Sequence, residues 1–88
     1  MQYLLKRLNV LDPATYDEIV RVRLEQFDIE YEGDLIQGII QRAAIKRGWY
    51  CQVVWGAYIG YMATVEGNTE EGDSPAAALL AAYLGALV

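Results

Sequence analysis

The sequence predicts a single α+β domain over residues 1–88, in which a short antiparallel β-sheet is covered by helices on both faces, as an α-β-α sandwich. Three observations lead to this prediction. Segments before residue 48 place apolar side chains at helical spacing, residues 49–65 alternate with a period of two, and the last fourteen residues carry no charge. With 88 residues, of which 55% are hydrophobic, the chain can build one core and has no room for a second.

The N-terminal segments contain one ambiguous element and one clear helix. Residues 1–11 fit a helix, because leucines recur at positions 4, 5, 8 and 11, or alternatively a short edge strand. Asp12-Pro13 then opens a helix that extends to about residue 27, and Thr15 with Glu18 offers a second capping-box start. The apolar face of this helix consists of Tyr16, Ile19, Val20, Leu24 and Phe27.

A further helix is predicted from Asp34 to Gly48. Asp34 is the expected N-cap, with Gln37 at the reciprocal position of the capping box. Basic residues near its C-terminal end complement the helix dipole, and Gly48 ends the helix. The buried stripe consists of Ile36, Ile39, Ile40 and Ala43.

The β-structure is predicted as a hairpin, with strands at residues 49–55 and 58–65 joined by Gly56-Ala57 in a type II′ turn. This turn places Trp49, Cys51, Val53, Trp55, Tyr58 and Met62 on one face of the hairpin. The other face then carries Tyr50, Val54, Ile59, Tyr61, Ala63 and Val65. Because both faces are apolar, we expect helices to cover both of them.

The C-terminal stretch is predicted as a helix that begins at Pro75, with Asp73 or Ser74 as N-cap. Fourteen helical residues extend about 21 Å, too short for a bilayer core of about 30 Å, so a membrane span is excluded. A helix that is apolar all round is expected to be a buried core helix. The alternative is a homodimer that forms through a strip of small residues, namely Ala78, Ala81, Ala82 and Gly85.

The charge balance selects among classes of partner. The chain carries 12 carboxylates and 7 basic groups, for a net charge of −5. Such a field disfavours direct binding to nucleic acid or to anionic lipid, both of which require positive charge. It favours a partner protein with a basic surface.

Two acidic segments and the hairpin tip are the candidate contacts with such a partner. If residues 28–34 are extended, the carboxylates at every second position lie along one edge; the alternative is a solvated loop. Further acids lie in a predicted loop after residue 65. Aromatic residues beside the hairpin turn project into solvent and suit an interface hot spot, whereas the other hairpin aromatics are expected in the core. The candidate partner-binding residues are Asp28, Glu30, Glu32, Glu66, Glu70, Glu71, Trp55 and Tyr58.

The sequence offers no pattern for catalysis or for a cofactor. Histidine is absent, and Cys51 is the only cysteine, so neither a disulfide within the chain nor a thiolate metal site is expected. Phosphate-binding loops, dinucleotide-binding turns and nucleophile elbows are also missing. We therefore expect a protein without enzymatic activity, metal or cofactor, in which Cys51 is a buried structural thiol in a reducing cytoplasm.

Residues 34–88 resemble the phage ABA-sandwich family of small phage and prophage proteins. The resemblance rests on a helix, a Trp-containing strand pair and an acidic loop, followed by an Ala/Leu-rich helix with Ser74, Pro75, Ala78 and Ala82. It implies a phage origin, the same layered architecture and a location in the cytoplasm of the host cell. Because the family is defined by its fold, the resemblance implies no catalytic residues.

Three functional hypotheses follow. The first is a non-enzymatic inhibitor that occupies a basic surface on a host defence or nucleic-acid-binding machine, as anti-CRISPR and other anti-defence proteins do. The second is a sponge for a nucleotide or another small ligand, held between protomers by tyrosines and by Arg21, Arg23, Arg42 or Arg47. The third is a minor structural or assembly factor of the virion. The acidic balance and the missing phosphate-binding loop favour the first.

Overall fold

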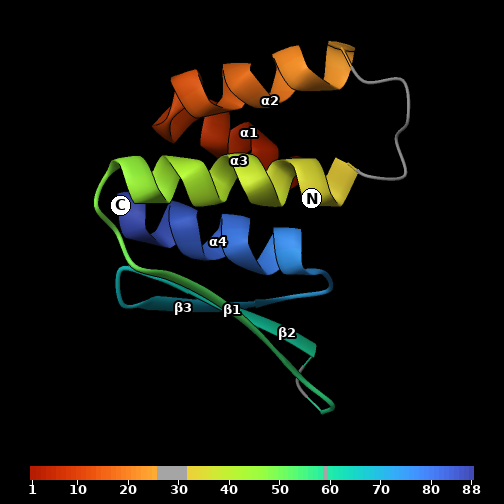
Figure 1. Cartoon of the computed structure of the whole chain (residues 1–88), viewed down its shortest axis with the longest axis vertical. Coiled ribbons are helices and arrows are strands. Elements are labelled where there is room, and N and C mark those ends of the chain that lie inside the picture. Colours follow the sequence, from red (N-terminus) through yellow and green to blue (C-terminus); the bar gives the residue numbers. More distant parts are fainter. Residues whose placement is uncertain (26–31, 59) are drawn as a thin grey trace.

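The computed structural model describes residues 1–25, 32–58 and 60–88, and within them the chain forms four helices and a three-stranded antiparallel sheet (Figure 1). The elements in chain order are α1 (Gln2–Leu11), α2 (Pro13–Glu25), α3 (Glu32–Lys46), β1 (Cys51–Gly56), β2 (Gly60–Val65), β3 (Asn68–Gly72) and α4 (Pro75–Leu87).

The first two helices meet at Asp12. The N-terminal segment is helical, so the alternative of an edge strand is wrong, and its leucines Leu5 and Leu8 are buried. The backbone of Asp12 has an extended φ of −148° and ends α1. Its carboxylate then accepts the N–H of Thr15 at 3.4 Å, while Pro13 occupies the first position of α2. The predicted helix start at Asp12-Pro13 is therefore confirmed.

Helix α3 begins two residues earlier than predicted. Glu32 and Asp34 both lie in its first turn, so Asp34 is not the N-cap. Carboxylates are favourable anywhere in the first turn, and the charge pattern alone does not select the cap residue. The predicted end is confirmed: Gly48 has a φ of +76°, and the N–H groups of Gly48 and Trp49 donate to Ile45 O and Ala44 O, as in a Schellman motif.

The hairpin register differs from the predicted one. Gly56 pairs with Gly60 and Trp55 with Tyr61, whereas a two-residue turn would pair Trp55 with Tyr58. The shift of three residues is odd, so it moves every side chain of the second strand to the opposite face. The predicted assignment of residues to faces is therefore wrong for β2, and one member, Ile59, lies outside the described residues.

With the observed register, the two faces of the sheet differ in polarity. The inner face, which packs on the helices, carries Cys51, Val53, Trp55, Tyr61, Ala63 and Val65. The outer face carries Gln52, Val54, Met62 and Thr64. Because the outer face mixes polar and apolar side chains, it does not require a covering helix.

The acidic segment after β2, predicted as a loop, instead forms strand β3. The turn between the two strands consists of Glu66 and Gly67, with φ values of +48° and +83°. Two central residues at positive φ are typical of the type I′ turn, which matches the twist of paired strands. Acidic residues disfavour a strand on average, but the turn and pairing with β2 override this preference at the sheet edge.

The layers follow from the position of α4. This helix packs on the inner face of all three strands, and α3 and α1 pack on its other side, with α2 outermost (Figure 1). The α+β class, with helices flanking a short antiparallel sheet, is confirmed. In the part of the chain that the structure describes, the helices lie on one side of the sheet, so the second face of the expected sandwich is open.

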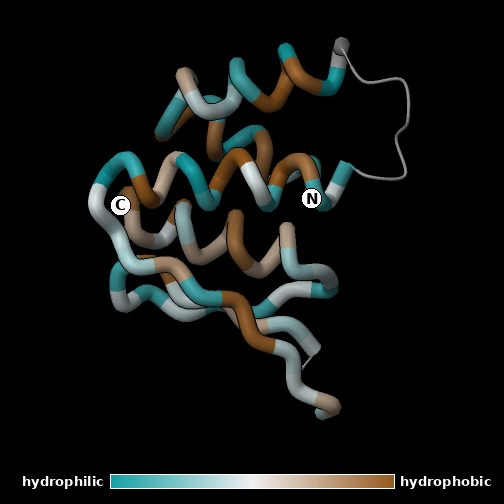
Figure 2. Tube along the Cα trace, viewed as in Figure 1, coloured by the Kyte–Doolittle hydropathy of each residue, from teal (hydrophilic) through white to brown (hydrophobic). Residues whose placement is uncertain are grey.

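Helix α4 is the centre of the core, as predicted. Ser74 caps it by accepting the N–H of Ala77 at 3.1 Å, and Pro75 is its first residue. No strongly hydrophilic residue interrupts it (Figure 2). Its buried side chains are Ala76, Ala78, Leu79, Leu80, Ala82, Tyr83 and Leu84.

The small residues of α4 serve close packing inside the protomer. A Cβ added at Gly72 would lie 2.5 Å from the backbone nitrogen of Ala78. Gly85 leaves room for the side chain of Asn68, whose amide donates to Ala82 O at 3.1 Å. Three of the four residues proposed for a helix-mediated homodimer, Ala78, Ala82 and Gly85, therefore contact the chain's own sheet. Among the described helices, none combines the length and the apolar character that a membrane span needs.

Candidate functional site

The described helices leave the outer face of the sheet uncovered (Figure 1). We call it the open face. The strand register places Gln52, Val54, Met62, Thr64, Thr69 and Glu71 on it. We include Tyr50, which bonds to the side chain of Gln52, and Glu66, which bonds to the backbone of Tyr50. Two of its large side chains are well exposed, Tyr50 at 62% and Val54 at 42%. Exposed apolar side chains next to carboxylates on an uncovered sheet face are suited to binding another protein.

Hydrogen bonds fix the polar side chains of the open face. The hydroxyl of Tyr50 donates to Gln52 Oε1 at 2.8 Å, and the hydroxyls of Thr64 and Thr69 are 2.8 Å apart. Glu66 accepts the N–H of Tyr50 through Oε2 at 3.1 Å and donates its own N–H to Tyr50 O at 2.9 Å. These contacts order several side chains before any partner binds, which lowers the entropic cost of binding.

The hairpin tip carries the two predicted aromatic contacts. Trp55 is 67% exposed and Tyr58 fully exposed. The tip extends past the helical layers (Figure 1), which explains why Trp55 is exposed although it lies on the inner side of the strand. Both residues are thus accessible, as the sequence predicted.

The predicted acidic residues that the structure describes lie in separate places and not along two continuous strips. Glu66 and Glu71 lie on the open face, whereas Glu70 is exposed on the opposite side of β3. Glu32 is 3.3 Å from Arg23 in an ion pair within the helical layers. Because Glu32 and Asp34 lie in α3, neither the extended strip nor its alternative, a solvated loop, describes residues 32–34. Asp28 and Glu30 lie outside the described residues.

The signs of charge divide along the chain. All 7 basic residues precede Gly48, where they balance most of the acids of the same segment. From residue 48 onward the charged residues are Glu66, Glu70, Glu71 and Asp73, with no Lys or Arg. The segment that forms the sheet and α4 therefore carries only negative charges. This division can be read from the sequence, whereas the net charge of the whole chain does not reveal it.

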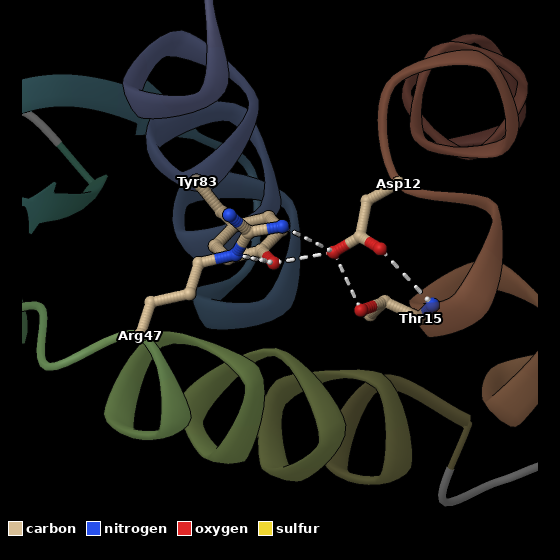
Figure 3. A network of polar contacts seen from close by, with 4 residues as sticks. All are labelled: Asp12, Thr15, Arg47 and Tyr83. Atoms are coloured by element: carbon tan, nitrogen blue, oxygen red, sulfur yellow. Dashed lines mark hydrogen bonds and ion pairs between the residues drawn. The ribbon is translucent and has the colours of Figure 1, made fainter.

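A second cluster of polar side chains joins the ends of three helices (Figure 3). Asp12 Oδ2 accepts hydrogen bonds from the hydroxyls of Thr15 and Tyr83, both at 2.6 Å, and lies 3.4 Å from Arg47 Nη2. Arg47 Nε also donates to the Tyr83 hydroxyl at 3.1 Å. We call these four residues the polar clamp. It connects the α1–α2 junction, the end of α3 and the middle of α4.

The clamp alters the ionisation of its members. Burial disfavours the ionised form of Asp12, but the hydrogen bonds from Thr15 and Tyr83 outweigh it and lower the pKa of this carboxyl below its usual value. Burial, and then the hydrogen bond donated to Asp12, raise the pKa of the Tyr83 hydroxyl. Asp12 is therefore a carboxylate with several donors already bound, which leaves it poorly suited to act as a general base.

Aromatic rings complete the environment of Arg47. Its guanidinium carbon lies 5.1 Å from the ring centre of Trp49 and 6.0 Å from that of Tyr83. The two rings are 5.8 Å apart and tilted by 57°. The main signal of this arrangement in the sequence is Tyr83 itself, because a tyrosine hydroxyl within an otherwise apolar helix needs a polar partner.

A cavity of about 300 Å³ lies beside the clamp. Its walls combine both signs of charge, and they consist of Asp12, Ala14, Thr15, Glu18, Ala43, Lys46, Arg47 and Tyr83. Arg47 and a tyrosine were among the residues expected in a ligand pocket. Here they line a cavity within one chain, and their polar atoms bind each other.

The remaining candidates for chemistry are few. Cys51 is partly buried, and burial raises the pKa of its thiol, as expected for an unreactive side chain. Within the described residues, no three side chains of the types His, Cys, Asp or Glu lie close enough to hold a metal ion together.

Comparison with family models, with curated proteins and with solved structures found no match to this chain.

Proposed function

We propose that this protein is a non-enzymatic interaction protein that binds a partner with a basic surface through its open face and hairpin tip. The observation that carries the proposal is the combination of exposed aromatic and apolar side chains with carboxylates, in a segment without any basic residue. Aromatic anchors supply most of the affinity at protein interfaces, while complementary charge raises the association rate.

The partner we propose is a host machine whose basic surface normally contacts nucleic acid. A compact acidic surface can occupy such a site and block it, which is how an anti-defence or anti-CRISPR protein acts. The acidic charge of the chain and the resemblance to small phage proteins support this assignment. The same proposal implies a phage-encoded protein that works in the host cytoplasm.

Affinity purification from a bacterial lysate tests the proposal, with the wild type compared with two variants. The first variant is Glu66→Gln with Glu71→Gln, which removes two charges from the open face but keeps an acceptor for the N–H of Tyr50. The second is Trp55→Ala with Tyr58→Ala at the hairpin tip. We expect a basic protein or complex that the wild type retains and that both variants lose in large part.

A matched control removes the same number of charges elsewhere. Asp17→Asn with Asp34→Asn changes two exposed acids on α2 and α3, and this variant should bind like the wild type. Higher salt should weaken wild-type binding towards that of the charge variant. Equal capture by all variants, with no effect of salt, would show that the open face and the tip are not the binding surface.

A second candidate function, a sponge for a small ligand, is favoured by the cavity beside the polar clamp. The cavity has Lys46 and Arg47 in its wall, and these could bind an anionic group. Asp12 and Glu18 in the same wall oppose an anion, so this candidate has less support. A thermal-shift assay with a panel of nucleotides distinguishes the two functions, because a sponge should show a raised melting temperature with one of them.

A further inference from the structure

Strand β1 is an edge of the sheet with backbone groups directed away from its neighbour. The sheet order is β1-β2-β3, and in the described chain β1 pairs with β2 alone. The N–H of Glu66 donates to Tyr50 O, so Tyr50 and every second residue after it direct their backbone groups towards β2. The N–H and C=O groups of Cys51, Val53 and Trp55 therefore point outward.

The two edges of the sheet differ in how they are protected against pairing. Strand β3 carries Glu70 and Glu71, and Asp73 follows it. Charges of this kind oppose pairing with another copy, because like charges would face each other. Strand β1 has the sequence CQVVWG, with no charge and no proline, and its Val54 and Trp55 are exposed. Only β1 lacks the usual protection of an edge strand.

The geometry points to a second copy of this chain as the occupant of the β1 edge. Two β1 strands would pair antiparallel about a two-fold axis at Val53, so that the outward-pointing backbone groups of one copy bond to those of the other. In this register Cys51 lies opposite Trp55 of the second copy, and Gln52 lies opposite Val54. The two three-stranded sheets would join into one sheet of six strands.

Self-pairing fits this edge better than pairing with the basic partner of the proposed function. None of the residues that would face each other is charged, so two acidic chains meet here without direct repulsion. A basic strand would find no carboxylate on β1 itself, since the acids of the open face lie on β3 and in the turn before it. Pairing at an edge also leaves the open face accessible. The dimer and the proposed binding of a basic partner are therefore independent of each other.

Sedimentation analysis of the purified chain over a range of concentrations tests the dimer. We expect a reversible dimer that tightens as salt is raised, because salt screens the repulsion between two chains of charge −5. Binding of a basic partner should respond to salt in the opposite direction. A monomer at every concentration up to millimolar, at low and high salt, would overturn the proposal and leave the proposed function intact.

Proline substitutions locate the interface. Val53→Pro removes an N–H that β1 does not use within the protomer, and it should weaken the dimer by about tenfold or more. Glu71→Pro is the matched control, since it removes an outward N–H from the β3 edge, and it should leave the dimer unchanged. Circular dichroism verifies that both variants fold. A dimer that responds equally to both prolines, or to Glu71→Pro alone, contradicts pairing through β1.

Cysteine cross-linking tests the register independently of the proline variants. In a Cys51→Ala background, one protein carries Gln52→Cys and another Val54→Cys, both on the open face. These positions would be a non-hydrogen-bonded pair with Cα atoms about 4.5 Å apart, within the range of a disulfide. The mixture should form a disulfide-linked dimer under mild oxidation, and each protein alone should not. Cross-linking of either protein alone, or none in the mixture, would show that this register is wrong.

Discussion

Helix α4 and the β1–β2 hairpin are both without charged residues, yet they lie in opposite environments. In α4, seven side chains are buried, and the sheet and two other helices surround them. In the hairpin, Val54, Trp55 and Tyr58 are 42%, 67% and 102% exposed. A segment without charge can therefore be buried at little cost. Whether it is buried within its own chain depends on where the fold places it relative to the other helices and strands. The exposed side chains of the hairpin are therefore available to contact a partner protein.

The largest effect should come from a charge placed in α4. Leu84 is 1% exposed, so Leu84→Asp buries an unpaired carboxylate and should cost about 4 kcal/mol or more. That loss approaches the whole stability of a small domain, and thermal or urea denaturation measures it. Val54→Asp on the open face is the comparison and should cost about 1 kcal/mol or less. Similar losses for both would refute the contrast between the two regions.

The contact between α4 and the sheet can be disturbed at a single glycine. A Cβ at Gly72 would lie 2.5 Å from the backbone nitrogen of Ala78, so Gly72→Ala should destabilise the fold by about 2 kcal/mol. Gly38 in α3 has no atom within 4 Å of an added Cβ. Gly38→Ala should therefore stabilise the protein by about 0.5–1 kcal/mol. Urea denaturation of both variants measures the difference, and a stabilised Gly72→Ala protein would contradict close packing there.

A variant of the polar clamp tests the contribution of Tyr83, the one polar side chain that α4 buries. Tyr83→Phe removes the hydroxyl that donates to Asp12 and accepts from Arg47, and it should cost about 1–2 kcal/mol. Tyr50→Phe removes an exposed hydroxyl that bonds to Gln52 on the open face, and it should change stability by less than about 0.5 kcal/mol. Both values come from urea denaturation at neutral pH. Equal losses would mean that burial of the hydroxyl makes no difference.

The clamp also predicts how stability depends on pH. The pKa of Asp12 is lowered in the folded protein, so its contribution is complete above the unfolded pKa of about 3.9 and is lost as the pH falls through the folded pKa. The pKa of Tyr83 is raised, so its contribution is complete below about 10 and is lost as the pH rises through the folded pKa. The free energy of unfolding, measured at several pH values, should decline on both sides of this range.

Two variants assign these pH effects to their residues. Asp12→Asn should reduce the slope of the unfolding free energy against pH on the acid side, by at most the slope that one bound proton produces. Tyr83→Phe should do the same on the alkaline side. Either variant with the unchanged pH profile of the wild type would show that its residue does not titrate in the clamp.

The smallest effect is expected at the hairpin tip. Tyr58 is fully exposed, so Tyr58→Ala should change the free energy of unfolding by less than about 0.5 kcal/mol. The same variant should weaken partner binding if the tip is an anchor, which separates its role from that of α4. A clear loss of stability would place Tyr58 in a contact within the protomer.

Local chemistry made several elements predictable. Asp12 before Pro13, Ser74 before Pro75 and Gly48 after α3 each specify a helix end through groups within a few residues, and all three are found at those ends. The absence of charge over fourteen residues indicated a covered helix, and α4 is indeed buried in the core. The alternation after residue 48 was sufficient to predict strands, because a period of two is a property of the strand itself.

The register of the hairpin was not predictable in the same way. Gly56-Ala57 fits a two-residue turn, but the pairing of Trp55 with Tyr61 brings Ala63 and Val65 onto the face that packs on α4. The choice depends on which alignment buries more apolar surface against a distant helix, and adjacent residues carry no information about that. The error in register also led to the expectation that helices cover both faces.

The sequence by itself therefore determined the starts of α2 and α4, the end of α3, the presence of a hairpin, the apolar C-terminal helix and the acidic character of the chain, since these depend on composition and on near neighbours. Only the tertiary structure decided the third strand, the open face, the unprotected β1 edge and the meeting of Asp12, Arg47 and Tyr83. Each of these requires residues far apart in the chain to come together. Their energies depend on partners that a local pattern does not contain.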